Sequence, residues 1–361
     1  MYTRIADSLT AVYDKVPSSV IDLSAEQTHY IVAPYFLNKK GGMMEISGGK
    51  GIGQLMMIDH GGRSRHVDAL DEDVVRIIDH LTKARVDFTR LTDSVSYTAD
   101  QLDENKGKEL ITNLIAPSKR AMHLRVIETL EEDFFVTPDA NDDKTPWSLK
   151  YWVVKAPAGT TEGGYTNGTG YPTGFTDVAG LSLTKVPQYR NYNDLYTSLT
   201  KEDAILKMKR AHRRTNWRSP RPQAGFKGDS SERRILLSNE TVCEGFEVLA
   251  EGQNENLGQD LASMHSGRRI PGLGVNNETG EVVFKKHPLI HAPLLDDDTS
   301  NPIYGLDMEY IKAATCKGTN MKMGAFVNLA AGKQHNVYSA NFDHKYQYIC
   351  FNRRPQWVIS S

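Results

Sequence analysis

The chain has 361 residues, with 43 Lys and Arg against 45 Asp and Glu, and a formal net charge of −2. This length supports a sizeable core without disulfides, and 9% aromatic residues argue against a disordered protein. The apolar runs, such as Leu55–Ile58, are too short to span a membrane. The N-terminal sequence MYTRIADSLTAVYDK lacks the apolar segment of a secretory signal. Three distant cysteines, Cys243, Cys316 and Cys350, predict free thiols in a reducing compartment.

The first 38 residues are polar, contain Pro17 and Pro34, and show no sustained hydrophobic period. They predict an extended arm. Two apolar runs, Met43–Ile46 and Leu55–Ile58, then flank the sequence GGKGIG. Apolar runs that bracket glycines predict a β-hairpin with a flexible tip. The tip would consist of Gly48, Gly49, Lys50, Gly51 and Gly53.

Helical spacing of apolar residues predicts a short helix over 71–81 and a long one over 101–135. Thr98 and Gln101 form a capping-box pattern at the start of the long helix. Pro117 predicts either a kink or two abutting helices. Between the two helical segments, Val86–Phe88 is typical of a strand.

The segment 147–196 is rich in Gly, Thr and Tyr and predicts strands joined by long loops. Thr200 and Asp203 form a second capping pattern before a helix that ends in basic residues. A buried strand over 234–238 and a helix over 242–250 follow. Further strands are expected over 281–285, 288–295, 336–340, 346–351 and 357–359. Segregated strands and helices favour an α+β fold.

The stretch from Lys207 to Lys227 contains eight Lys and Arg, no Asp or Glu, and Trp217. Contact with nucleic-acid phosphates is one interpretation of this pattern. The other interpretation is a basic helix end and loop that serve structure or subunit contact. The candidate contact residues are Lys209, Arg210, Arg213, Arg214 and Arg218.

The other patterns predict no catalytic, cofactor or metal site. GGKGIG lacks the helix that a phosphate loop requires, and HPLIH has no local carboxylate to complete a metal site. Asp296–Asp298 opens a calcium-loop pattern, but Asn301 stands where the sharp turn needs glycine. Glu131–Asp133 is interpreted as the solvated end of a helix. An enzyme whose site is assembled from distant loops remains an alternative.

The order of the segments along the chain is informative. The arm and the glycine-containing loop come first, followed by a long helix opened by SVSYTADQL, and then by the segments SLTKEDAILKMKRAHRR and RRILLSNETVCEGFEVLAE. KKHPLIHAPLLDDDTSNPIYGLD and the ending YQYICFNRRPQWVIS complete it. This order resembles the major capsid proteins of tailed bacteriophages over nearly the whole chain.

The resemblance implies an N-terminal arm over 1–38, an extended loop and short helix over 39–94, and a peripheral domain with a spine helix over 95–140. An A domain over 141–325 and a closing β segment over 326–361, shared with the peripheral domain, would follow. The implied function is a shell subunit without enzymatic activity, assembled in the host cytoplasm into the virion.

The implied partners are other copies of the chain in hexamers and pentamers, a separate scaffolding protein, a portal, and packaged double-stranded DNA contacted without sequence specificity. A membrane is not expected as a partner. A sequence-nonspecific nucleic-acid-binding protein, or an enzyme with a distributed site, are the alternative functions.

Overall fold

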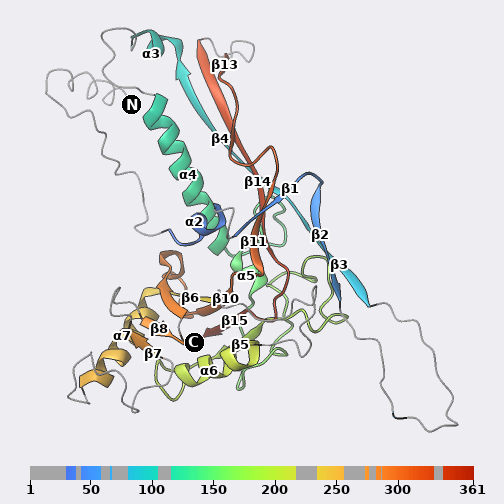
Figure 1. Ribbon diagram of the computed structural model, residues 1–361, viewed down its shortest axis with the longest axis vertical. Helices are drawn as coiled ribbons and strands as arrows, with labels where there is room; N and C mark the ends of the chain where they lie inside the picture. Colours follow the sequence, from blue (N-terminus) through green and yellow to red (C-terminus); the bar gives the residue numbers. More distant parts are fainter. Residues whose placement is uncertain are drawn as a thin grey trace.

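A computed structural model describes residues 30–37, 42–57, 66, 80–104, 115–216, 234–255, 273–275, 282–285, 287–328 and 336–361. The molecule has an elongated part, at the top of Figure 1, and a compact part below it. Helices and strands are segregated along the chain, so the predicted α+β class is confirmed.

The elongated part is built on one long strand, β14 (Val337–Cys350). The sequence predicted two separate strands in this segment. The central order is β1-β11-β14-β12, and β14 also pairs with β4 and β13. Alternate residues of β4 are buried and exposed, as expected where one face of a sheet packs on a core. The partners of β14 are β4 (Thr89–Thr98), β11 (Ile311–Cys316), β12 (Lys322–Met323) and β13 (Val327–Asn328), and β1 (Met43–Ile46) pairs with β11.

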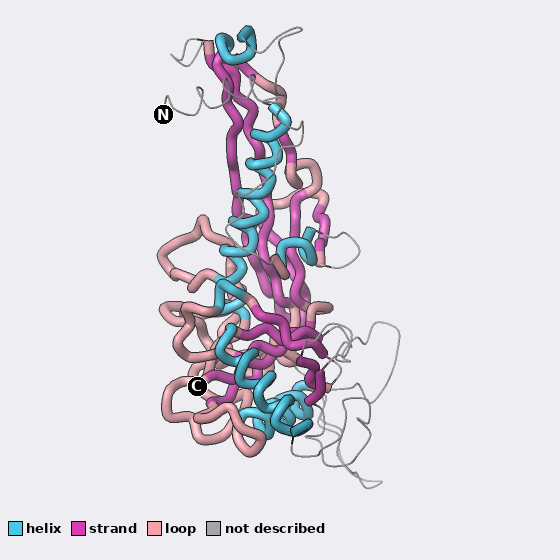
Figure 2. Tube along the Cα trace, turned by 90° about the vertical axis from the view of Figure 1, so that its left-hand side faces the viewer, coloured by secondary structure: helices cyan, strands magenta, loops and turns pink. Residues whose placement is uncertain are grey.

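Helix α4 (Ile115–Phe135) runs along the long strands, as Figure 2 shows. Its buried stripe repeats every four residues, which is the helical spacing that keeps one face on a sheet. The stripe consists of Met122, Val126, Leu130 and Phe134. Tyr348 of β14 fixes the helix by donating a hydrogen bond of 2.7 Å to the Leu130 carbonyl.

The predicted helix over 101–135 is two helices in the described residues. Helix α3 (Ala99–Glu104) follows β4 directly, and α4 has Pro117 in its first turn, where the ring costs little. The capping box at the start of α3 is confirmed. The Gln101 amide donates to the Thr98 hydroxyl at 3.3 Å, and the Thr98 amide donates to the Gln101 side chain at 3.2 Å.

The compact part contains a sheet of order β5-β15-β10-β6-β9-β8-β7. Its central strands are buried along their whole length, as is typical of strands covered on both faces. Helices α6 (Ala204–Thr215) and α7 (Glu240–Glu255) lie beside this sheet in Figure 1. The strands are β5 (Tyr192–Leu195), β6 (Arg234–Ser238), β7 (Leu273–Val275), β8 (Val282–Phe284), β9 (His287–His291), β10 (Ile303–Asp307) and β15 (Trp357–Ser360).

The predicted strand over 288–295 is wrong in its second half. Strand β9 ends at His291, and Pro293–Leu295 forms the short helix η3. The helix predicted over 71–81 lies outside the described residues except for its C-terminal end, where Leu81 begins strand β3.

Each of the two sheets contains strands from both sides of the boundary predicted between residues 325 and 326. Strands β11 and β12, within 141–325, belong to the sheet of β14. Strand β15, within 326–361, pairs with β10 and β5 in the compact sheet. The closing segment therefore contributes to both sheets, so sequence boundaries do not separate the two parts.

Strands β2 (Gly51–Met57) and β3 (Leu81–Asp87) form an antiparallel pair that we call the ribbon. The predicted pairing of Met43–Ile46 with Leu55–Ile58 across GGKGIG is wrong. Met43–Ile46 is β1, which runs parallel to β11, while Leu55 faces Lys83 in β3. The parallel register of β1 places its apolar residues beside the buried alanines of β11, which explains the different partner.

Candidate functional site

The segment before β1 is held by a buried carboxylate. Within the predicted extended arm, Val32–Leu37 is instead the short helix α2, with Val32, Ala33 and Phe36 buried. Phe36 packs on Phe134 and Tyr348, with ring centroids 5.4 and 5.2 Å apart. An apolar cluster at helical spacing, with a protein surface to cover, explains why this segment is not extended.

Glu131 of α4 receives the first amides of α2. Its two carboxylate oxygens accept hydrogen bonds of 2.7–3.2 Å from the backbone amides of residues 31–33. Only 2% of Glu131 is exposed, so its interpretation as part of a solvated helix end is wrong. The carboxylate satisfies amide groups that lack partners at the start of a helix. This contact fixes the chain where residues 1–29 join the body.

Asp133 is the second residue of that acidic triplet to lie inside the fold. It accepts a short hydrogen bond from the Tyr346 hydroxyl of β14. Burial raises the pKa of the Asp133 carboxyl. Glu132, between the two, is exposed and fits the sequence interpretation.

The outer face of the ribbon exposes a cluster of apolar side chains at one end, beside the charged residues Lys83, Arg85 and Asp87. Leu55, Met57 and Leu81 are 63%, 55% and 54% exposed. Residues directly opposite in an antiparallel pair share a face, and Met57 lies opposite Leu81. The other face carries Ile52, Ala84 and Val86, which are buried. One face of the ribbon therefore packs on its own chain and the other offers exposed apolar side chains.

The glycines predicted as a loop tip lie at the start of the ribbon. Gly48 and Gly49 have φ of 150° and 112° in the turn after β1, where glycine is favoured. Gly51 and Gly53 lie in β2. A Cβ on Gly53 would lie 2.3 Å from the Lys83 side chain, and one on Gly51 would lie 2.3 Å from the Asp87 carboxylate.

Lys50 lies between these glycines, and its carbonyl accepts the Phe88 amide at 3.4 Å. The close approach of the Val86 carbonyl oxygen, 2.7 Å from a Cβ on Gly51, gives a reason for Gly51 that does not depend on flexibility, whereas the flexible end of Lys83 could move away from a Cβ on Gly53.

The predicted basic residues Lys209, Arg210, Arg213 and Arg214 all lie on α6, whereas Arg218 and Trp217 lie outside the described residues. Arg214 donates to the Gly163 carbonyl at 2.6 Å and lies 6.0 Å from the centre of the Tyr192 ring. Arg213 is exposed. Arg214 therefore anchors the glycine-rich loop, and Arg213 is available for contact.

Arg234 of β6 and Lys285, which follows β8, add further positive charge beside α6. Burial, together with the charges of Arg213, Lys209 and Arg234, lowers the pKa of Lys285, which follows β8. Burial and the charges of Lys285, Arg234 and His287 lower the pKa of His212 to about 3. A neutral His212 accordingly lies within a positive surface that is suited to phosphate.

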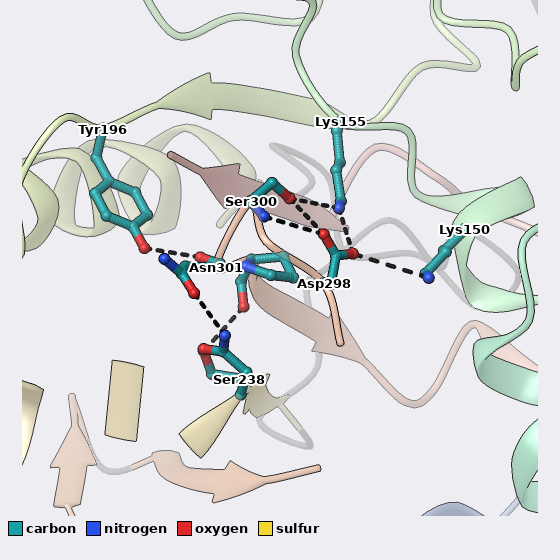
Figure 3. A network of polar contacts seen from close by, with 9 residues as sticks. Lys150, Lys155, Tyr196, Ser238, Asp298, Ser300 and Asn301 are labelled. Atoms are coloured by element: carbon teal, nitrogen blue, oxygen red, sulfur yellow. Dashed lines mark hydrogen bonds and ion pairs between the residues drawn. The ribbon is translucent and has the colours of Figure 1, made fainter. Parts of the chain in front are cut away.

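A polar network joins the two lysines after α4 to the loop before β10 (Figure 3). Lys155 donates to the Asp298 carboxylate at 2.5 Å and to the Ser300 hydroxyl at 2.6 Å. Lys150 lies 3.8 Å from the same carboxylate. Although burial opposes it, hydrogen bonds from Lys155 and Ser300 hold the pKa of Asp298 below its usual range. Burial lowers the pKa of Lys155, and its hydrogen bond and charge contact with Asp298 oppose this shift.

Hydrogen bonds on the far side hold this loop in place. The Tyr196 hydroxyl donates to the Asn301 carbonyl at 2.8 Å, and the Ser238 hydroxyl donates to the Pro302 carbonyl at 2.9 Å. Asp296, at the start of the loop, accepts the Glu240 amide at 2.8 Å and lies 2.9 Å from His291. The fold thus places Asp296, five residues after the end of HPLIH, beside His291.

No group of three or more His, Cys, Asp or Glu within the described residues is arranged to hold a metal ion. The three cysteines are free, and Cys350 is buried. None of the helices in the described ranges is long and apolar enough to cross a membrane.

Solved structures resemble this chain over nearly its whole length. The asymmetric unit of the cyanophage A-1(L) capsid has a TM-score of 0.59 and 12% identity, covering 97% of this chain and 98% of that chain. The capsid of Myoviridae phage XM1 has a TM-score of 0.52 and 9% identity, covering 97% of each chain. This chain has the tailed-phage capsid fold.

The same capsid fold relates the chain to the SrpI encapsulin of Synechococcus elongatus PCC 7942, with a TM-score of 0.51 and 9% identity, covering 98% of this chain and 94% of that chain. No family model and no curated protein sequence matches the chain. The sequence resemblance to phage capsid proteins is confirmed at the level of the fold.

Sequence reasoning missed the Glu131 contact, the ribbon face and the Asp298 network. The ribbon face had a signal, since Leu55, Met57 and Leu81 are apolar residues at alternate positions of two strands. The Glu131 contact and the Asp298 network had no such signal, because the residues that they join lie about 100 or more positions apart in the chain.

Proposed function

We propose that this chain is the structural subunit of a closed icosahedral shell that encloses the double-stranded DNA of a tailed phage. The observation that carries the proposal is the apolar outer face of the ribbon, in a chain that has the capsid fold. Burying an exposed leucine or methionine is worth about 1.5–3 kcal/mol, so an isolated subunit leaves this stabilisation unused. A neighbouring copy supplies the missing cover.

The subunit acts without enzymatic chemistry in this proposal. Its partners are copies of itself in hexamers and pentamers, a separate scaffolding protein, and a portal. It assembles in the host cytoplasm and ends in the virion. The arm over 1–38 and the loop over 39–94 make contacts between copies, with Gly48, Gly49, Lys50, Gly51 and Gly53 at the base of the ribbon.

Electron microscopy and light scattering on the purified full chain, with a scaffold where needed, test the proposal. Closed shells of uniform diameter are expected. A chain that stays a compact monomer over the whole range of salt and protein concentration would contradict it.

A phage capsid and an encapsulin-like compartment differ in what the shell encloses. We propose that Lys209 and Arg213 contact DNA phosphates, because both lie on the same helix and share a positive environment with Lys285. Changing both to Glu is expected to reduce the salt dependence of DNA binding by about two in log–log slope. The exposed Lys185, changed to Glu, is the charge control. Unchanged DNA binding in the double variant would contradict the proposed DNA contact, but it would not contradict the proposed shell.

A further inference from the structure

A cavity of about 650 Å³ lies between the two parts of the molecule, away from the ribbon and from α6. Its lining comes from Thr137 and Pro138 after α4, from α5 (Leu149–Trp152) and the turn after it, from the loops over 167–173 and 294–299, and from Tyr304 of β10. Its volume is in the range of ligand pockets. The walls combine apolar side chains, such as Val153, Pro172 and Leu294, with the Asp298 network.

The acceptor capacity of Asp298 on the polar wall is largely used. One oxygen of Asp298 accepts the Ser300 hydroxyl at 2.7 Å and the Ser300 amide at 3.3 Å. The other accepts Lys155 at 2.5 Å and lies 3.8 Å from Lys150. A carboxylate offers about four lone-pair directions, and three hydrogen bonds from Ser300 and Lys155 already use most of them.

The donors on the same wall are not fully used. An ammonium group carries three protons. Lys155 uses two of them, on Asp298 and Ser300, and the described residues offer Lys150 one distant contact with Asp298. Two lysines against one carboxylate leave one positive charge. Asp297 also lines the cavity, but it is exposed, so solvent screens its charge.

A third donor is the hydroxyl of Tyr304. The side chain is 0% exposed, lines the cavity, and its oxygen has no hydrogen-bond partner among the described residues. Burial and the nearby Asp298 charge raise its pKa, so the hydroxyl stays protonated. An unpartnered buried hydroxyl costs about 1–3 kcal/mol, and a ligand that accepts its proton would recover this.

We propose that this cavity binds a carboxylate group with a short apolar body, held by Lys150, Lys155 and the Tyr304 hydroxyl. The spare capacity is in donors, so the ligand must supply acceptors. Lys150, Lys155 and Asp298 together leave one positive charge, which the single negative charge of a carboxylate balances. A phosphate dianion would instead leave one negative charge beside Asp298. The loop is held by Tyr196 and Ser238, so the site is formed before the ligand arrives.

The test uses thermal unfolding of the full-length chain with butyrate, and with butyramide as its neutral counterpart. Butyrate is expected to raise the unfolding temperature in a saturable manner, and butyramide is not. Lys150→Met is expected to weaken butyrate affinity at least about tenfold, the effect of one partly screened charge contact. Lys144→Met, at an exposed lysine outside the cavity, is the matched control.

Tyr304→Phe keeps the experiment decisive if Lys150→Met unfolds. It removes a hydroxyl that has no partner, so the fold is expected to persist while butyrate affinity falls about fivefold. Equal stabilisation by butyrate and butyramide, or unchanged affinity in both variants, would overturn the proposal.

The carboxylate has two sources that the test separates. If a second copy of the chain supplies it, butyrate binds the unassembled chain but not the assembled particle. If a free small acid supplies it, butyrate binds both. Either result supports the site. The site itself is tested on the unassembled chain and so does not depend on the proposed shell function, whereas the comparison of the two sources rests on that function.

Discussion

The elongated and compact parts of this chain are stabilised in different ways. In the compact part, all residues of β10 and β15 are buried, including the large side chain of Trp357. In the elongated part, β4 alternates between buried and exposed residues, and the ribbon leaves one apolar face uncovered. The compact part thus completes its own core, whereas the elongated part leaves apolar surface exposed, which other copies would cover in the proposed shell.

The largest effect is expected at Arg353, which ties the glycine-rich loop to the compact part. Its guanidinium is fully buried and donates to the carbonyls of Trp152, Gly170 and Tyr189 at 2.6–3.3 Å. Arg353→Met leaves these acceptors without partners, so a loss of about 4 kcal/mol in the free energy of unfolding is expected. Urea denaturation measures it, and Arg354→Met at the exposed neighbour is the control. A similar loss in both variants would contradict this role.

A smaller effect is expected in the elongated part, at Glu131. Glu131→Gln replaces one acceptor oxygen with a donor facing the α2 amides, so about 2 kcal/mol is lost. Amide exchange of Val32 and Ala33 should accelerate more than exchange in β10. Glu132→Gln is the matched control, since that side chain is exposed. Uniform acceleration across both sheets would mean that α2 is not held locally.

Stability is expected to fall below neutral pH through a histidine of the elongated part. Burial lowers the pKa of His344 from its usual 6.5 to about 4. The unfolded chain therefore binds a proton first, and the contribution of His344 is complete above pH 6.5 and is lost as pH falls toward about 4. At about pH 5.5 the loss is about 1 kcal/mol.

His344→Asn keeps an acceptor for the Met321 amide and removes the titration. In this variant, the free energy of unfolding measured by urea denaturation should depend less on pH, by the amount that one histidine proton contributes. His212, in the compact part, has a pKa lowered to about 3, and its contribution to the pH dependence of stability should remain in the variant. An unchanged pH profile in His344→Asn would contradict the assignment.

Local patterns in the sequence predicted the elements that depend on near neighbours. The capping box at Thr98, helix α6, strand β6 and helix α7 follow from spacing within a few residues. The resemblance in segment order predicted the capsid fold, although 9–12% identity to the solved capsid structures leaves little else in common.

Partners distant in sequence decided the rest. The apolar run Met43–Ile46 had the right composition for a hairpin, but the buried alanines of β11 offered a better neighbour. Glu131 looked like a surface residue because the amides that it binds lie 98 to 100 positions earlier. The cavity is likewise lined by segments that no local pattern connects.

The central claim is that the outer face of the ribbon is reserved for another copy of the chain. The double variant Leu55→Ser, Leu81→Ser removes apolar surface that is already exposed, so the free energy of unfolding should change by no more than about 0.5 kcal/mol. Gln54→Ser, on the opposite face of β2, is the control. Mass photometry under assembling conditions should show at least a tenfold loss of closed particles in the double variant alone. Normal assembly of the double variant would contradict the account.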